Sequence, residues 1–223
     1  MANQSLAILY FFSFILLFST FVSAEQCHPD DKKALLQIKE HFRNPDTLKT
    51  WTPNTDCCKT WFQVGCDQTT YRVTFVKILY NRNTIGPIPS AIGDLPYLQV
   101  LGLSNLPNVT GPIPQSITKL KNLIFLDLSS IDIGGKIPEF LFELTSLTDL
   151  ILSDSKFSGP LPTSTGKLTN LQTLLLDRNG FTGTIPTSFT KITKLIAFSV
   201  SNNKLCGQIP FGGKLQAFDN SSY

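Results

Sequence analysis

LTDLILSDSKFSGPLPTSTGKLTN, residues Leu147–Asn170, is followed directly by LQTLLLDRNGFTGTIPTSFTKITK, residues Leu171–Lys194. Both stretches have leucine at positions 1, 4 and 6, glycine at position 13 and proline at position 16. Outward from them, the same pattern returns every 24 or 25 residues between Val73 and Gly207. The six repeats begin at Val73, Leu98, Leu123, Leu147, Leu171 and Leu195. A fixed period of this length predicts a solenoid, in which stacked repeats share one continuous core.

Each repeat has a predicted inner and outer side. Apolar positions 4 and 6 alternate with positions 3, 5 and 7, which is the period of a strand with one buried face. Six such strands in parallel predict a sheet about 24 Å across. The glycine column predicts sharp turns at positive φ, and the proline column is expected to end those turns.

Asparagine at position 9 is expected to hydrogen-bond the backbone of the turn after the strand. Asn179 and Asn203 occupy this position, whereas Ile131 and Ser155 replace the asparagine in two repeats. In the second repeat, one extra residue is expected to shift this role to Asn108. The predicted asparagine ladder is therefore incomplete.

The exposed side of the predicted sheet consists of positions 3, 5, 7 and 8. Exposed apolar side chains rimmed by charge are typical of a protein-binding surface, although some of them are simply good strand formers. The predicted binding residues are Val100, Phe125, Asp127, Asp149, Ile151, Asp154, Thr173, Leu175, Asp177 and Arg178.

Residues 1–24 have the pattern of a secretory signal peptide. Leu6 to Val22 is an uncharged apolar run, and Val22-Ser23-Ala24 offers a cleavage site. A retained signal anchor is the alternative, but the run is shorter than the ~20 residues of a spanning helix. We expect a secreted protein that begins near Glu25, and no membrane span after cleavage.

Residues 25–72 are predicted to form a cysteine-rich cap over the first repeat. Cys27, Cys57, Cys58 and Cys66 suit two disulfides, with three possible connectivities; a bridge between the two adjacent cysteines is disfavoured by geometry. Their spacing does not suit zinc. A helix is expected within residues 29–45, capped by Asp30 or Asp31.

Composition excludes several classes of function. The net charge of +3 comes from 19 basic and 16 acidic residues without a basic cluster, so a nucleic-acid footprint is not expected. The two histidines, His28 and His41, lie in the cap, so no Ser-His-Asp triad is possible on the sheet. We predict neither enzymatic activity nor a cofactor.

The repeat LxxLxLxxNxLxGxIPxxLxxL resembles the plant extracellular class of leucine-rich repeat. The cap CHPDDKKALLQIKEHFRNPDTLKTWTPNTDCCKTWFQVGCD is similar to that of polygalacturonase-inhibiting proteins, and NNKLCGQIPFGGKLQAFDNSSY to the start of their C-terminal cap. The resemblance implies an α/β solenoid, a right-handed leucine-rich repeat superhelix with a concave parallel sheet and a helical, disulfide-bonded cap. It also implies the pairs Cys27–Cys57 and Cys58–Cys66.

This resemblance implies a monomeric plant defence protein of the cell wall. It would bind a fungal polygalacturonase, or another wall-degrading enzyme, on its concave sheet, and pectin is a further possible ligand. The alternatives are an ice-binding antifreeze protein, a receptor-like ligand-binding module and an inactive truncated paralogue. Ice binding would be expected to use a flat ladder of threonine or asparagine, and the position before the glycine column offers only Thr110, Ser158 and Thr182.

The sequence departs from the family in its array, which at six repeats over residues 73–210 is shorter than usual. Residues 211–223 form a partial C-terminal cap, which leaves Cys206 without a partner and predicts a poorly covered last strand. Asn108 and Asn220 lie in N-glycosylation sequons.

Overall fold

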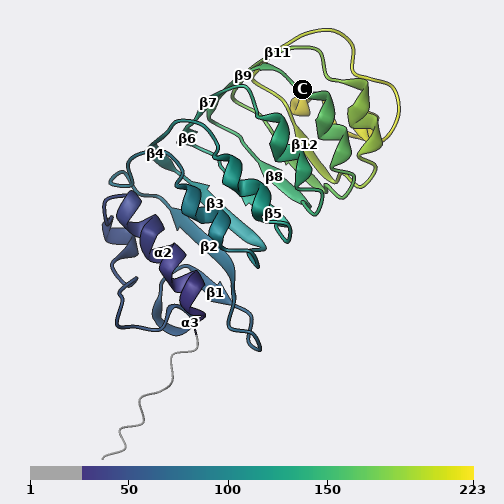
Figure 1. Cartoon of the computed structure of the whole chain (residues 1–223). Coiled ribbons are helices and arrows are strands. Elements are labelled where there is room, and N and C mark those ends of the chain that lie inside the picture. The colour runs from purple at the N-terminus through teal and green to yellow at the C-terminus, as the bar shows by residue number, and fades with distance from the viewer. Residues whose placement is uncertain (1–26) are drawn as a thin grey trace, which may run out of the picture.

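The computed structural model describes residues 27–223, except for the side chain of Asn220. The predicted signal peptide therefore lies outside the described residues. The chain is a right-handed leucine-rich repeat solenoid, with helix α2 over its first repeat and the repeats stacked in sequence order (Figure 1). This confirms the predicted fold class.

The concave face is a sheet of seven strands, one more than predicted. Six strands, one from each repeat, are parallel and in register, as expected from the repeat pattern. The seventh, β1, comes from the cap and pairs antiparallel with β2, so it covers the first edge of the sheet. In spatial order the strands are β1 (Val64–Cys66), β2 (Val73–Leu79), β3 (Val100–Ser104), β5 (Phe125–Asp127), β8 (Asp149–Ile151), β10 (Thr173–Leu175) and β12 (Ala197–Ser199).

Beyond the concave strands, the chain forms a second layer of short parallel strands, in two sheets. One sheet pairs β4 (Leu106–Thr110) with β6 (Ile131–Asp132). The other contains β7 (Gly134–Gly135), β9 (Lys156–Pro160), β11 (Gly180–Gly183) and β13 (Lys204–Leu205). The glycine column lies at these turns with φ of 78° to 111°, as predicted.

The convex side consists of short 3-10 helices, each of which begins after a proline of the repeat. These prolines have φ between −65° and −72°, and the carbonyl of each accepts the first helical hydrogen bond. The proline column therefore starts a helix. The helices are η3 (Ser90–Asp94), η4 (Gln115–Lys119), η5 (Glu139–Glu143), η6 (Thr163–Lys167) and η7 (Thr187–Lys191).

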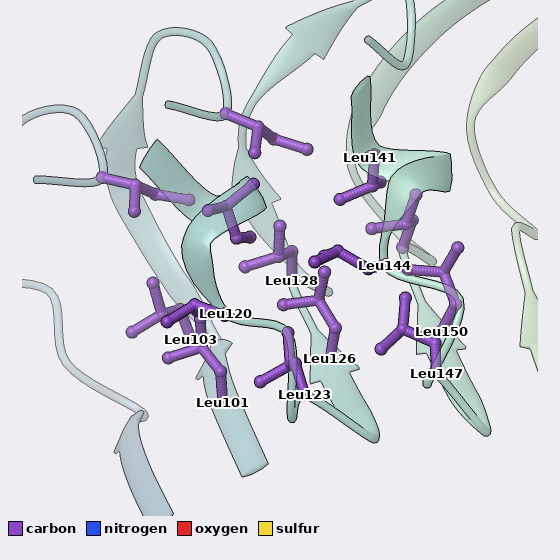
Figure 2. Close-up of a cluster of buried hydrophobic side chains, with 14 of the residues drawn as sticks. Leu101, Leu103, Leu120, Leu123, Leu126, Leu128, Leu141, Leu144, Leu147 and Leu150 are labelled. Carbon is purple, nitrogen blue, oxygen red and sulfur yellow. The ribbon is translucent and has the colours of Figure 1, made fainter. Parts of the chain in front are cut away.

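The core lies between the concave sheet and these helices. Figure 2 shows leucines of successive repeats converging there: Leu101 and Leu103 from β3, Leu126 from β5, and Leu120 from the helical side. All of them are fully buried. Because each repeat buries its leucines against those of its neighbours, the core has no boundary between repeats.

The position 9 asparagines form the ladder predicted for Asn179 and Asn203. The Asn179 amide nitrogen donates to the carbonyls of Leu152, Leu176 and Asp177, and its oxygen accepts from the Phe157 N–H at 3.0 Å. In the fourth repeat, Ser155 replaces the asparagine, and its hydroxyl donates to the carbonyls of Leu128 and Ser153 at 3.3 Å.

The role predicted for Asn108 is wrong. Its exposed amide donates to the Arg82 carbonyl at 2.6 Å, outside the ladder. The ladder position of that repeat is occupied by Leu106, which is fully buried and pairs with Ile131 of the next repeat. Two neighbouring apolar residues can replace the asparagine there because they pack against each other in the core.

The cap contains helices α2 (Pro29–His41), η2 (Asp46–Leu48) and α3 (Cys57–Thr60), with disulfides Cys27–Cys57 and Cys58–Cys66. The predicted N-cap of α2 is wrong. His28 caps the helix, because its Nδ1 accepts from the Asp30 N–H at 3.3 Å.

Asp31 instead connects the cap to the first repeat. Its carboxylate is fully buried and accepts two hydrogen bonds from the Arg72 guanidinium, at 2.6 and 2.9 Å, and one from the Val73 N–H at 2.8 Å. The hydrogen bond to Asp31 raises the pKa of Arg72.

The last concave strand is better covered than predicted. Phe218 and Tyr223 pack their rings against Phe198, and the Val200 N–H donates to the Ser222 carbonyl at 2.7 Å. These contacts come from the segment that contains η8 (Leu215–Ala217) and η9 (Asn220–Ser222). Residues after the repeats therefore fold back over the end of the core. Cys206 is exposed and unpaired among residues 27–223.

One backbone feature was not predicted: position 8 is left-handed in all six repeats, with φ of 51° to 56°. Asparagine, aspartate and glycine tolerate this region, whereas bulky residues are strained there. Tyr80 is therefore the least suited of the six, and it is 77% exposed.

Tyr80→Asn is expected to raise the free energy of unfolding by about 1 kcal/mol. Urea unfolding measures this; a loss of stability relative to the parent would contradict the strain argument.

Adjacent 3-10 helices approach most closely where a glycine faces a serine of the next repeat. A Cβ added to Gly93 would lie 2.3 Å from the Ser116 carbonyl oxygen. Gly93→Ala is therefore expected to destabilise the protein by about 1–3 kcal/mol. The exposed Ser90, in the same helix, gives the control Ser90→Ala. Equal urea midpoints for the two variants would show that the repeats can separate without cost.

Candidate protein-binding face

The register of the concave sheet brings the predicted binding residues onto one surface. Val100 and Phe125 are direct neighbours at position 3, and Ile151 and Leu175 are direct neighbours at position 5. All four side chains are half-buried. They form an apolar stripe that crosses the face obliquely, because the apolar position changes from 3 to 5 between the third and fourth repeats. Thr173 lies beside this stripe, in register with Asp149.

Two aspartates on this face have no cationic partner within residues 27–223. Asp127 accepts hydrogen bonds from the Ser129 N–H and hydroxyl, at 2.9 and 2.6 Å. Asp149 accepts one from the Thr148 hydroxyl at 2.7 Å. Both are half-buried beside the apolar stripe, so their charge is available to a cation on a partner.

The other two predicted acids are already paired. Asp177 is only 8% exposed; it accepts from the Ser153 hydroxyl at 2.5 Å and forms an ion pair of 2.8 Å with Arg178. Arg178 also lies 3.9 Å from Asp154, whose carboxylate accepts from the Ser130 hydroxyl. The expectation that Asp177 is exposed is wrong, since the position 7 side chains of neighbouring repeats hydrogen-bond each other. Asp177 therefore orients Arg178, which remains exposed together with Asp154.

The prediction omitted the first repeat, where Phe75 and Lys77 extend the same face. The Lys77 ammonium lies 5.4 Å from the Phe75 ring centroid and 5.1 Å from that of Phe125. Cation–π contacts of this kind hold a charge at a defined place. The repeat pattern places Phe75 and Lys77 at exposed positions 3 and 5, but it does not show that Lys77 reaches a ring two strands away.

The cluster of three cysteine sulfurs and the two sequons lie outside the strands of the concave sheet. The sulfurs of Cys27, Cys57 and Cys58 cluster within 4.8 Å, but all three belong to disulfides and are not free thiolate ligands. Asn108 is exposed in strand β4, and its glycosylation remains a prediction. The Asn220 side chain lies outside the described residues.

Comparisons with known proteins agree with this architecture. A family model described as "Leucine rich repeat N-terminal domain" matches residues 28–67, and one described as "Leucine Rich Repeat" matches residues 170–192. A polygalacturonase inhibitor of Vitis vinifera is 47% identical over 106 residues, which are 48% of this chain and 31% of that protein. The chain thus spans about a third of the length of this curated relative.

Solved structures cover the chain more fully. The leucine-rich repeat ectodomain of the receptor kinase SOBIR1 from Arabidopsis thaliana is 30% identical with a TM-score of 0.70, over 82% of this chain and 98% of that one. A plant ice-binding protein is 29% identical with a TM-score of 0.62, over 89% of this chain and 94% of that one.

Three kinds of match point to the same architecture. The cap and one repeat match family models, the repeats stack as in plant ectodomains, and part of the sequence matches an inhibitor at high identity. The chain belongs to the plant leucine-rich repeat proteins, and about half of it is similar to a polygalacturonase inhibitor.

Proposed function

We propose that this chain is a secreted plant defence protein that binds and inhibits a fungal polygalacturonase on its concave face. The observation that carries the proposal is the oblique apolar stripe with two unpaired aspartates beside it, on a chain similar to named polygalacturonase inhibitors. Apolar contacts at the centre and charge at the rim are the anatomy of protein interfaces. The same face would serve if the target is another wall-degrading enzyme.

The proposed location is the cell wall, outside the plasma membrane. Within residues 27–223, no helix has the length and hydrophobicity needed to cross a bilayer. The two disulfides suit an oxidising compartment. Binding of pectin and the monomeric state remain parts of the proposal that stand on family resemblance.

The proposal is tested by substitutions in the stripe. Ile151→Glu places a charge among the half-buried apolar side chains, so we expect the inhibition constant for a sensitive fungal polygalacturonase to rise by about tenfold or more. Ile196→Glu is the matched control, because Ile196 is 74% exposed and lies outside the stripe. Thermal unfolding of both variants separates lost binding from lost folding. Wild-type protein that inhibits no enzyme of a fungal panel at micromolar concentration would refute the function.

Ice binding is the second candidate, favoured by the fold of the plant ice-binding protein. The residues available for it do not form a threonine ladder: Thr182 is paired in register with Pro160 on one side and Lys204 on the other. An ice-recrystallisation assay on the same sample decides between the two functions. Ice crystals that stay small during annealing at micromolar protein concentration would favour ice binding.

A further inference from the structure

Lys77 is the one cationic side chain in the position 3 and position 5 rows of the concave face, and it has no carboxylate within ion-pair distance among residues 27–223. Asp127 lies in the same row, two strands away, but its carboxylate is turned to the Ser129 N–H and hydroxyl of its own strand end. The nearest acid in the row therefore leaves the Lys77 charge uncompensated.

The aliphatic stem of Lys77 packs against the backbone of the sheet at Gly102. Gly102 lies between Lys77 and Asp127, and a Cβ on Gly102 would be 3.0 Å from Lys77 Cγ and 3.4 Å from Cδ. The Lys77 stem thus lies against the bare backbone of β3, which lets its ammonium reach the Phe125 ring. Gly102 does not have a positive φ, so the backbone conformation does not require glycine there. A glycine inside a strand weakens it and often marks such a close approach.

An ammonium held against two rings keeps its N–H donors for an acceptor on a partner. Because its stem and rings are already packed, Lys77 loses little conformational freedom on binding. Aromatic anchors and desolvated charge pairs are typical of the residues that dominate interface energy. The geometry is that of a preformed receptor for one carboxylate.

We propose that Lys77, seated on Gly102 between the rings of Phe75 and Phe125, anchors an aspartate or glutamate side chain of the protein bound on the concave face. This assignment rests on the proposed function, since it names the chemistry that the bound enzyme presents opposite the first three repeats. It places the anchor at the cap end of the face, where Lys77 meets the apolar stripe at Phe125.

One arm of the test needs no enzyme. The full mature chain, carrying carbon-13-labelled lysine, is titrated with an acetylated and amidated Gly-Glu-Gly peptide and with its Gly-Gln-Gly counterpart, while lysine side-chain NMR signals are followed. The Lys77 signal is identified by its disappearance in Lys77→Met. We expect the glutamate peptide to shift that signal more than any other lysine signal, and the glutamine peptide to leave it unchanged. Equal shifts at all lysines would overturn the proposal.

The second arm uses a fungal polygalacturonase that the wild-type chain inhibits. Lys77→Met keeps an apolar stem over Gly102 and removes the charge, so we expect about tenfold or more loss of affinity. Gly102→Ala displaces the stem and is expected to lose a similar factor. The exposed Lys204, in the second layer of strands, gives the control Lys204→Met, for which no change is expected.

The two arms separate failure of this proposal from failure of the proposed function. Unchanged affinity of Lys77→Met, in a chain that does inhibit the enzyme, overturns the anchor and leaves the inhibitor function intact. A wild-type chain that inhibits no polygalacturonase refutes the inhibitor function, and the peptide titration then decides on the carboxylate site alone.

Discussion

Asp31→Ala is expected to lower the free energy of unfolding by about 3–5 kcal/mol, because it breaks a buried ion pair between the cap and the first repeat. The carboxylate is fully buried and accepts hydrogen bonds from Arg72 and from the Val73 N–H. Its removal leaves a guanidinium that is only 16% exposed without its counter-charge. It also leaves an unpaired N–H at the first residue of β2, where the cap meets the solenoid.

The control for this prediction lies one residue away. Asp30 is in the same turn of α2, but its side chain is 82% exposed. Asp30→Ala should therefore cost no more than about 1 kcal/mol, the usual contribution of an acid near a helix N-terminus. Urea unfolding of the disulfide-intact proteins measures both. Similar midpoints for the two variants would mean that Asp31 is not what holds the cap to the first repeat.

Asn179→Ala is expected to destabilise the protein by about 2–4 kcal/mol, because it leaves the Phe157 N–H and the Leu152 carbonyl without their hydrogen-bond partner. The side chain bonds to Leu152 of the preceding repeat as well as to Leu176 of its own, so it joins neighbouring units. Its oxygen accepts the Phe157 N–H. Loss of these bonds affects the stacking of the repeats and not only one turn.

The chain itself supplies a graded comparison. Ser155 occupies the equivalent position one repeat earlier with bonds of 3.3 Å, so Asn179→Ser should lose less stability than Asn179→Ala. Asn122→Ala removes one hydrogen bond, to the Pro96 carbonyl, at an exposed turn and should cost about 1 kcal/mol or less. Thermal and urea unfolding of the three variants give the order. If Asn179→Ala and Asn122→Ala lose the same free energy of unfolding, the asparagine ladder does not contribute the predicted stability.

Three errors in the sequence-based predictions share one cause, which is pairing between residues far apart in the chain. Asp31 is of a residue type that often caps helices, yet it accepts hydrogen bonds from Arg72, which is 41 residues away. Asp177 has the position of an exposed residue, yet Ser153 of the preceding repeat binds it. Asn108 has the residue type of the ladder, yet Leu106 occupies the ladder position because Ile131 of the next repeat packs beside it.

The sequence by itself determined the period, the apolar inner face, the turns at glycine and the surface on which binding residues lie. These features repeat locally, and strand alternation and positive φ need no knowledge of the neighbouring repeat. Only the tertiary structure decided which charges on that surface stay available, since pairing depends on the register between repeats. In the folded protein, Asp177 is paired with Ser153 and Arg178 and is not available to a partner. Lys77 lies between two aromatic rings, because Gly102 has no side chain that would displace the lysine stem.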